Sequence, residues 1–316
     1  MFSVVGRKPL TNSVARFAPS PTGSLHAGSL LAAVGSYLDA RANGARWLVR
    51  IEDLDTARVI PGCEAQMLRT LEAYGFEWDG AVIRQSERRD AYREALAALD
   101  AAHRTFRCSC SRRDLAGSDE ETQRYPGTCR LGPTRPGPTA VRFRVSDGTV
   151  RFDDLFLGSQ EFDTRALGDF VIERRDRVTS YQLAVVVDDA WQGVTRVVRG
   201  ADLVASTPWQ WELQSALNMP RPIYGHLPLL TEPGGEKLSK SKRAVPIPSV
   251  SGTAGRSELS AVSQALTATL THLSQTPPPE LAHASIKDVW KWAVAHWNPQ
   301  ALVGRRRVEL SASGDK

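Results

Sequence analysis

The feature that most constrains the fold of this chain is a strand, loop and helix unit near its N-terminus. A short strand from Arg16 leads into a proline- and glycine-containing loop at residues 18–23, and a helix is expected to begin near His26. A second strand is predicted at residues 47–51, and apolar side chains at helical spacing follow at residues 67–74. Strands that alternate with helices predict an α/β fold with a parallel sheet.

A segment of different character interrupts this pattern. From Cys108 to residue 138 the chain is polar, bears cysteines and then becomes rich in proline and glycine, and β-like runs follow. The α/β pattern resumes at residue 181, and the tail from residue 305 is expected to be frayed. The expected parts are the first half of an α/β core (14–100), an inserted α+β module (101–180), the second half of the core (181–250) and a C-terminal helical segment (257–304).

The composition is that of a globular protein. Hydrophobic residues make up 41% and charged residues 24%, which indicates neither disorder nor a membrane protein. No apolar run approaches the ~20 residues that span a bilayer, so a cytoplasmic location without membrane contact is expected. A net charge of +5 fits weak attraction to RNA, although many proteins with other functions carry as much charge.

The loop after the first strand contains a candidate ATP site. Pro19 helps to fix a tight turn, while Gly23 and Gly28 let the backbone approach a nucleotide closely. The helix N-terminus that follows favours phosphate, and His26 can donate a hydrogen bond as negative charge shifts. A single His-x-Gly is more often an ordinary turn with a surface histidine.

A second candidate ATP site lies about two hundred residues later, in the polar run from Lys237 to Ser241. Lys237 and Lys240 offer two cations, and Ser239 and Ser241 offer two hydroxyls, after a pair of glycines. A mobile loop of this kind can close over a triphosphate and offset its charge. Alone, such a loop is usually only solvated surface.

Three of the four cysteines are clustered, which favours a metal over a disulfide framework. Cys108, Cys110 and Cys129 supply three thiolates, and zinc usually takes four ligands in a tetrahedron. His103 is the conventional guess for the fourth ligand, and three incidental reduced thiols are the alternative. Cys63 lies outside the cluster and is expected to be buried.

The two loops, in this order on a split α/β pattern, resemble the two signatures of the class I aminoacyl-tRNA synthetases. The runs at residues 16–23, 50–55 and 198–203 look like the glutamyl branch, and the resemblance covers residues 13–246. It implies a Rossmann-type catalytic core that an inserted module splits. Ser29 departs from the family pattern, which often has a second histidine there, and Leu238 replaces the usual methionine.

The resemblance also implies the site residues. His26, Gly28 and Lys240 match the family's catalytic positions. The positions that match the family's glutamate site are Arg16, Ser20, Glu52, Tyr181 and Arg199. The arginines can pair with the side-chain carboxylate of glutamate and Glu52 can hold its ammonium group. The family's zinc set matches Cys108, Cys110, Tyr125 and Cys129, so Tyr125 is the expected fourth ligand of a structural zinc ion.

Only 75 residues follow Ser241, which is short for the anticodon-binding region of a conventional glutamyl-tRNA synthetase. The chain therefore looks like the truncated paralogues, the glutamyl-queuosine tRNA(Asp) synthetase family. The expected function is activation of L-glutamate by ATP, with Mg²⁺, and transfer of glutamate to the queuosine base of tRNA(Asp) by a monomer. The alternatives are a conventional synthetase acting on tRNA(Glu) and a catalytically silent, zinc-containing tRNA-binding protein.

Overall fold

A five-stranded parallel sheet lies at the centre of the computed structural model, which describes residues 13–115, 124–232, 245–249 and 255–310. The strand order is β10-β9-β1-β2-β3. The strands are β1 (Val14–Phe17), β2 (Arg46–Ile51), β3 (Ile83–Arg84), β9 (Arg196–Gly200) and β10 (Ile223–Leu227). The chain enters at the central strand, builds one half outward and later returns to build the other half. The expected parallel α/β sheet is confirmed.

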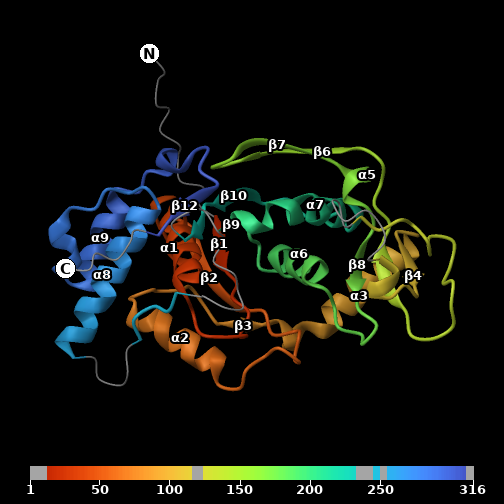
Figure 1. Cartoon of the computed structure of the whole chain (residues 1–316), viewed down its shortest axis with the longest axis horizontal. Helices are drawn as coiled ribbons and strands as arrows, with labels where there is room; N and C mark the ends of the chain where they lie inside the picture. The colour runs from red at the N-terminus through yellow and green to blue at the C-terminus, as the bar shows by residue number, and fades with distance from the viewer. Residues whose placement is uncertain (1–12, 116–123, 233–244, 250–254, 311–316) are drawn as a thin grey trace, which may run out of the picture.

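Helices cover this sheet on two sides, and Figure 1 shows α1, α8 and α9 to the left of the strands and α6 and α7 to the right. The larger helices are α1 (Ala27–Ala42), α2 (Cys63–Ala73), α3 (Arg89–Ala101), α6 (Tyr181–Trp191), α7 (Thr207–Ala216), α8 (Arg256–His272) and α9 (Ile286–Ala295). Short helical turns are η1 (Gln85–Arg88), α4 (Arg112–Leu115), α5 (Thr164–Leu167), η2 (Ala201–Ser206), η3 (Pro279–His283) and η4 (Pro299–Leu302). None of the helices in the described part of the chain is long and apolar enough to cross a membrane.

An aromatic cluster joins the sheet to the C-terminal helices. The Trp47 ring on β2 lies 5.1 Å from Tyr37 of α1 and 5.4 Å from Phe76, measured between ring centroids. Trp290 of α9 contacts the same two partners, at 4.7 Å from Tyr37 and 4.9 Å from Phe76. The indole N–H of Trp290 donates to the Tyr74 carbonyl at 2.8 Å, so its polar atom is satisfied inside the core.

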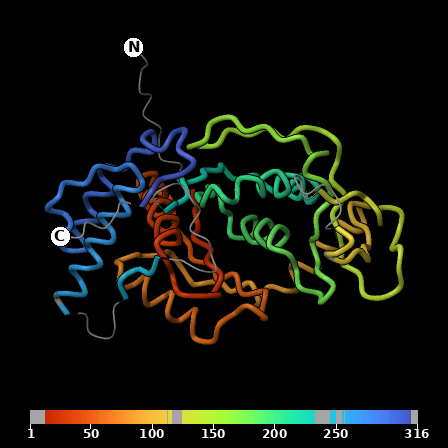
Figure 2. The backbone as a smooth tube through the Cα atoms, in the orientation of Figure 1, coloured from red at the N-terminus to blue at the C-terminus, as the bar shows by residue number. Residues whose placement is uncertain are grey.

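Residues 101–180 form two antiparallel units. A three-stranded sheet of order β4-β5-β8 contains β4 (Thr105–Cys108), β5 (Ala140–Phe143) and β8 (Phe170–Glu173). Phe143 and Phe170 of this sheet share one core with Leu183 of α6 and Leu213 of α7. The hairpin of β6 (Thr149–Asp154) and β7 (Gly158–Asp163) runs along the edge of the molecule (Figure 2). The segment therefore packs directly on the helices of the central sheet.

The C-terminal tail differs from its expectation. The helices predicted after residue 257 are present as α8 and α9, but the expectation of a frayed tail from residue 305 is wrong for residues 305–310. Residues Arg307–Glu309 form β12, which pairs in parallel with β11 (Leu229–Thr231). Val308 packs against the main core, and this burial orders a strand too short to give a periodic signal.

We predict that Trp290→Ala lowers the free energy of unfolding by about 3–5 kcal/mol, because it removes a large buried side chain and leaves a cavity. Trp290 is 8% exposed. Trp191→Ala is the control, since that tryptophan is 58% exposed and its loss is expected to cost below about 1 kcal/mol. Chemical denaturation measures both, and equal losses would contradict the role given to Trp290.

Candidate active site

The first signature forms the N-terminal cap of α1. The His26 Nδ1 atom accepts hydrogen bonds from the backbone N–H groups of Gly28 at 3.1 Å and Ser29 at 3.3 Å. Because Nδ1 accepts these protons, the neutral imidazole carries its own proton on Nε2. The Ser29 hydroxyl accepts from the His26 N–H at 2.6 Å, so the residue that departs from the family pattern completes a capping box.

Gly28 lies directly beneath the imidazole of His26. A Cβ atom at Gly28 would stand 3.1 Å from Cε1 and 3.2 Å from Nδ1 of His26. A side chain there would crowd the ring and shift it. Glycine at this position therefore lets His26 occupy the helix N-terminus.

The second signature residues Lys237, Ser239 and Lys240 lie outside the described residues. The chain that follows them returns to the first signature, since the Val245 carbonyl accepts from the Ala27 N–H at 3.0 Å. Pro246 and His26 also form an antiparallel β-bridge. Residues 245 and 246 are thereby fixed beside the cap of α1.

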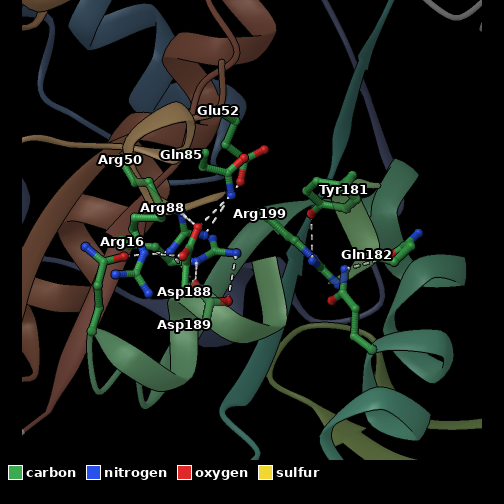
Figure 3. Close-up of polar contacts among 12 residues, drawn as sticks. Arg16, Arg50, Glu52, Gln85, Arg88, Tyr181, Gln182, Asp188, Asp189 and Arg199 are labelled. Atoms are coloured by element: carbon green, nitrogen blue, oxygen red, sulfur yellow. Dashed lines mark hydrogen bonds and ion pairs between the residues drawn. The ribbon is translucent and has the colours of Figure 1, made fainter. Parts of the chain in front are cut away.

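A buried cluster of charges lies at the carboxyl ends of β1 and β2, beside α6 (Figure 3). Arg16 of β1 donates from Nε to Oδ1 of Asp189 at 3.1 Å, and Arg50 of β2 donates from Nη1 to the same oxygen at 2.8 Å. Arg16 is 4% exposed and Arg50 is fully buried. Burial alone would raise the pKa of Asp189, but the two guanidinium groups hold it below its ordinary value.

The neighbouring Asp188 accepts hydrogen bonds from residues of the segment that follows β3. Its carboxylate accepts from Gln85 at 2.8 Å, from Arg88 at 2.6 Å and from the Tyr92 hydroxyl at 2.7 Å. Burial and the nearby Asp188 raise the pKa of Tyr92, so this hydroxyl stays protonated and keeps donating. Asp188 therefore ties α6 to η1 and α3.

Glu52 stands at the edge of the charged cluster without a complete set of partners. Its Oε1 lies 3.6 Å from Nη2 of Arg50, and both atoms are buried without a hydrogen-bond partner among the described residues. Burial raises the pKa of Glu52 to about 7, although Arg50 and Arg16 act to lower it. A perturbed carboxyl group with an unsatisfied oxygen at the end of a parallel strand is a candidate for binding a cation.

Arg199 lies at the end of β9, the strand beside β1. Its Nη1 donates to the Tyr181 hydroxyl at 3.1 Å, its Nη2 donates to the Thr207 hydroxyl at 2.9 Å, and its Nε donates to Nε2 of His226 at 3.1 Å. Arg199 is 5% exposed. Nη1 has a second proton, and the Tyr181 hydroxyl that accepts from it can donate in turn, so the pair offers two donors suited to a carboxylate.

The remaining described candidates lie in the loop after β1. Pro19 is buried and its carbonyl accepts from the Glu52 N–H at 3.0 Å, which holds the loop against β2. Ser20 is exposed, and Gly23 has an extended backbone with φ of 158°.

Two further acidic residues after β2 are engaged within the protein. Asp53 accepts from the Ser86 backbone at 2.8 Å, and Asp55 pairs with Arg58 at 2.7 Å and Arg174 at 3.0 Å. These contacts account for both carboxylates without a bound metal.

The three clustered cysteines meet Tyr125 in one place. The Tyr125 hydroxyl oxygen lies 3.4 Å from Sγ of Cys108 and 3.8 Å from Sγ of Cys110, and Cys110 lies 3.6 Å from Cys129 between sulfur atoms. A tetrahedral zinc ion with Zn–S bonds of about 2.3 Å separates its thiolates by about 3.8 Å. The spacing and the donor set therefore fit zinc.

The charge state of this cluster is already biased towards a thiolate. Burial would raise the pKa of Cys129, but hydrogen bonds from Ser109, Tyr125 and Thr134 lower it to about 5. Burial and the neighbouring Cys129 raise the pKa of Cys110 to about 11. His103 is exposed and is not in the group of metal-ligating side chains found among the described residues.

Sequence patterns alone missed several residues of the site. Arg50, Asp188, Asp189 and His226 were not singled out as site residues, yet each is buried and is hydrogen-bonded or ion-paired to a predicted residue or to its partner. Asp188 and Asp189 could have been noticed in the sequence, because two adjacent aspartates directly follow the apolar run at residues 183–187, whose side chains are buried. Lysine or arginine partners are needed wherever such acids are buried.

Comparisons with known proteins agree on one family. The family described as tRNA synthetases class I (E and Q), catalytic domain, matches residues 13–258. The glutamyl-Q tRNA(Asp) synthetase of Aromatoleum aromaticum is 50% identical over 290 residues, which cover 90% of this chain and 89% of that protein. The glutamyl-Q tRNA(Asp) synthetase of Geobacter sulfurreducens is 50% identical over 298 residues, which cover 92% and 93%.

Solved structures give the same answer for the fold. The glutamate-tRNA synthetase of Elizabethkingia anophelis superposes with a TM-score of 0.78 at 25% identity, covering 95% of this chain and 68% of that one. The methionyl-tRNA synthetase of Mycobacterium tuberculosis shares the fold at 17% identity, with a TM-score of 0.55. The chain therefore belongs to the class I tRNA synthetase family of the glutamate and glutamine type, on the glutamyl-Q tRNA(Asp) synthetase branch, and is a ligase of the aminoacyl-tRNA synthetase type.

Proposed function

We propose that this ligase activates L-glutamate with ATP as glutamyl-adenylate and transfers the glutamyl group to the queuosine base in the anticodon of tRNA(Asp). The names of relatives that are 50% identical over nine-tenths of the chain support the acceptor. The observation that supports glutamate as the amino acid is the hydrogen bond between buried Arg199, on the strand next to that of Arg16, and Tyr181 at the start of α6, with Glu52 just after the end of β2. We further infer a cytoplasmic location, since its substrates are ATP and tRNA, and we propose that the protein acts as a monomer.

The proposed glutamate site uses charge of both signs. The free proton of Arg199 Nη1 and the Tyr181 hydroxyl bind the side-chain carboxylate of glutamate. Glu52 binds the ammonium group, and the absence of a hydrogen-bond partner for its Oε1 among the described residues supports this role. Ser20 adds a hydroxyl from the loop. Arg16 is engaged by Asp189, so it contributes positive charge beside Glu52.

The proposed ATP site is built around the cap of α1. Its members are Pro19, Gly23, His26, Gly28, Lys237, Ser239 and Lys240. An oxygen of the glutamate α-carboxylate attacks the α-phosphorus, and the bond to pyrophosphate breaks. His26 Nε2–H, the helix N-terminus at Gly28 and Lys240 stabilise the charge that builds up in this step. Mg²⁺ that enters with ATP supplies further positive charge on the phosphates.

In the second step a hydroxyl of the modified base attacks the activated carbonyl. The new ester bond forms as AMP leaves, and the hydroxyl proton passes to solvent or to the leaving phosphate. Positioning of the two substrates contributes most of the rate enhancement in such a transfer.

We also propose that Cys108, Cys110, Tyr125 and Cys129 hold one structural zinc ion in the module at residues 101–180. Four protein donors close the coordination sphere, which is typical of structural zinc sites. The ion cross-links β4 to the loop that precedes β5. Residues 14–100 and 181–250 are the proposed halves of the catalytic core, and residues 257–304 are the proposed helical segment.

Exchange of labelled pyrophosphate into ATP tests the first step. We expect exchange that depends on L-glutamate and needs no tRNA. Charging with labelled glutamate then tests the acceptor, and we expect label on queuosine-containing tRNA(Asp) but not on queuosine-free tRNA(Asp) or on tRNA(Glu). His26→Ala is expected to lower the exchange rate by about 10²-fold, as for removal of one donor to the transition state.

The conventional synthetase is the second candidate, because the fold matches a glutamate-tRNA synthetase with a TM-score of 0.78. Labelling of tRNA(Glu) would favour it over the proposed acceptor. Absence of exchange with every amino acid would contradict both activities and leave a silent tRNA-binding protein.

A pH dependence of glutamate binding follows from Glu52. Because its raised pKa of about 7 leaves the carboxyl group uncharged at lower pH, Glu52 pairs with the ammonium group only as pH rises. We predict that the dissociation constant for L-glutamate falls about tenfold from pH 6 to pH 8, in proportion to the ionised fraction. Calorimetry on the wild type and on Glu52→Gln measures this. An equally steep change in Glu52→Gln would assign the titration to another group.

The zinc assignment predicts one equivalent of zinc in the purified protein. Cys129→Ser is expected to lose the ion and to lower the unfolding temperature by several degrees, because the cross-link is lost. Cys63→Ala is the matched control, since Cys63 is 4% exposed and lies in α2, outside the cluster. Elemental analysis and thermal unfolding give both quantities, and full zinc content in Cys129→Ser would exclude that cysteine as a ligand.

A further inference from the structure

A buried chain of three side chains leads from the β6–β7 hairpin to Arg199. Asp154 ends β6, His226 lies in β10, and Arg199 lies in β9. The carboxylate oxygen Oδ2 of Asp154 is 2.6 Å from Nδ1 of His226, and Nε2 of His226 is 3.1 Å from Nε of Arg199. Asp154 is 4% exposed, Arg199 is 5% exposed and His226 is fully buried.

The donors and acceptors in this chain allow one arrangement of protons. The Arg199 guanidinium is always charged and its Nε–H can only donate, so Nε2 of His226 must accept. The imidazole proton therefore lies on Nδ1 and is donated to Asp154. The Thr207 hydroxyl, 3.3 Å from Nε2, accepts from Arg199 and can donate its own proton to the same nitrogen.

The charge state of the imidazole agrees with this arrangement. Burial lowers the pKa of His226, Asp154 opposes that effect, and the nearby positive charge of Arg199 adds to it. The net direction is downward, so the ring is neutral near pH 7. A neutral ring with a bare Nε2 is the form that accepts from Arg199.

Asp154 is itself fixed by the backbone. Its Oδ1 accepts the N–H groups of Phe156 at 3.0 Å, Leu157 at 3.0 Å and His226 at 3.1 Å. These three donors fill Oδ1 and leave Oδ2 for the imidazole. Burial would raise the pKa of Asp154, but His226 and these N–H groups hold it below its ordinary value. The carboxylate is therefore both charged and immobile.

We propose that Asp154 and His226 are positioning residues for glutamate recognition, because they fix the imidazole tautomer that orients Arg199. This inference rests on the proposed glutamate site. Asp154 belongs to the hairpin between the two halves of the sheet, so the inserted segment contributes directly to the geometry of the amino-acid site.

Asp154→Asn tests the proposal with little change of shape. The three backbone donors require the amide oxygen at the Oδ1 position, so the amide N–H₂ faces Nδ1 of the imidazole. The ring proton must then move to Nε2, where it opposes the Nε–H of Arg199. We expect the KM for glutamate in pyrophosphate exchange to rise about 10- to 100-fold, with the KM for ATP changed less than about threefold.

A second substitution separates positioning from structural damage. His226→Gln places a carbonyl oxygen near the Nε2 position and accepts from Arg199 whatever residue stands at position 154. The double variant Asp154→Asn with His226→Gln is therefore expected to recover glutamate KM to within about fivefold of the wild type. Losses that simply add in the double variant would overturn the proposal.

Asp169→Asn is the matched control. Asp169 is also 4% exposed and pairs with Arg130, but it does not contact Arg199. It is expected to lower the unfolding temperature without a selective effect on glutamate KM. A selective rise in glutamate KM in Asp169→Asn would show that any buried aspartate has this effect and would overturn the proposal.

The tautomer can be observed without any activity. In ¹⁵N-histidine-labelled protein, with His226→Gln used for assignment, we expect a protonated Nδ1 and a bare Nε2 in the wild type. Asp154→Asn should reverse them. A wild-type imidazole protonated on Nε2 would overturn the proposed role of Asp154 and His226, even if the protein activates glutamate. If the expected tautomer were observed but exchange did not depend on glutamate, the proposed function would be rejected. The hydrogen-bonded chain from Asp154 through His226 to Arg199 would still stand.

Discussion

The adjacent carboxylates of Asp188 and Asp189 are the interaction on which the rest of the site depends. They lie on α6, after the inserted segment, and bind arginines that precede it on β1, β2 and η1. Each carboxylate is buried, so loss of its partners would leave an uncompensated charge at a cost of about 3–5 kcal/mol. The pair therefore fixes where α6 lies against the sheet, and α6 begins with Tyr181.

This arrangement separates two kinds of arginine. Arg16 and Arg50 are committed to acids of the protein, whereas Arg199 is held by neutral groups and keeps a donor for a ligand. Glu52, beside Arg50, has a raised pKa and an oxygen without a hydrogen-bond partner in the described part of the chain. An amino acid with a second carboxylate matches both ends of such a site, since it brings an ammonium group for Glu52 and an anion for Arg199.

Local patterns predicted the parallel sheet, the helix that begins near His26 and the C-terminal helices, because strand and helix periodicities are properties of neighbouring residues. The clustering of Cys108 with Cys129 could also be predicted, because the two cysteines lie close together in the sequence. The partners of Arg16 and Arg199 were not, since Asp189 lies 173 residues from Arg16 and His226 lies 27 residues from Arg199. By residue type alone, many acidic or histidine side chains could pair with these arginines. The packing of α6, β9 and β10 determines which of them do. The β11 and β12 pair was missed for the same reason.

Locating the transferred glutamyl group on the RNA tests the central claim most directly. Queuosine-containing tRNA(Asp) would be incubated with the protein, ATP and isotope-labelled glutamate, digested with a base-specific ribonuclease and analysed by mass spectrometry. Our account predicts the added glutamyl mass on the fragment that contains the anticodon and none on the 3′-terminal fragment. Glutamyl mass confined to the 3′-terminal fragment would contradict it.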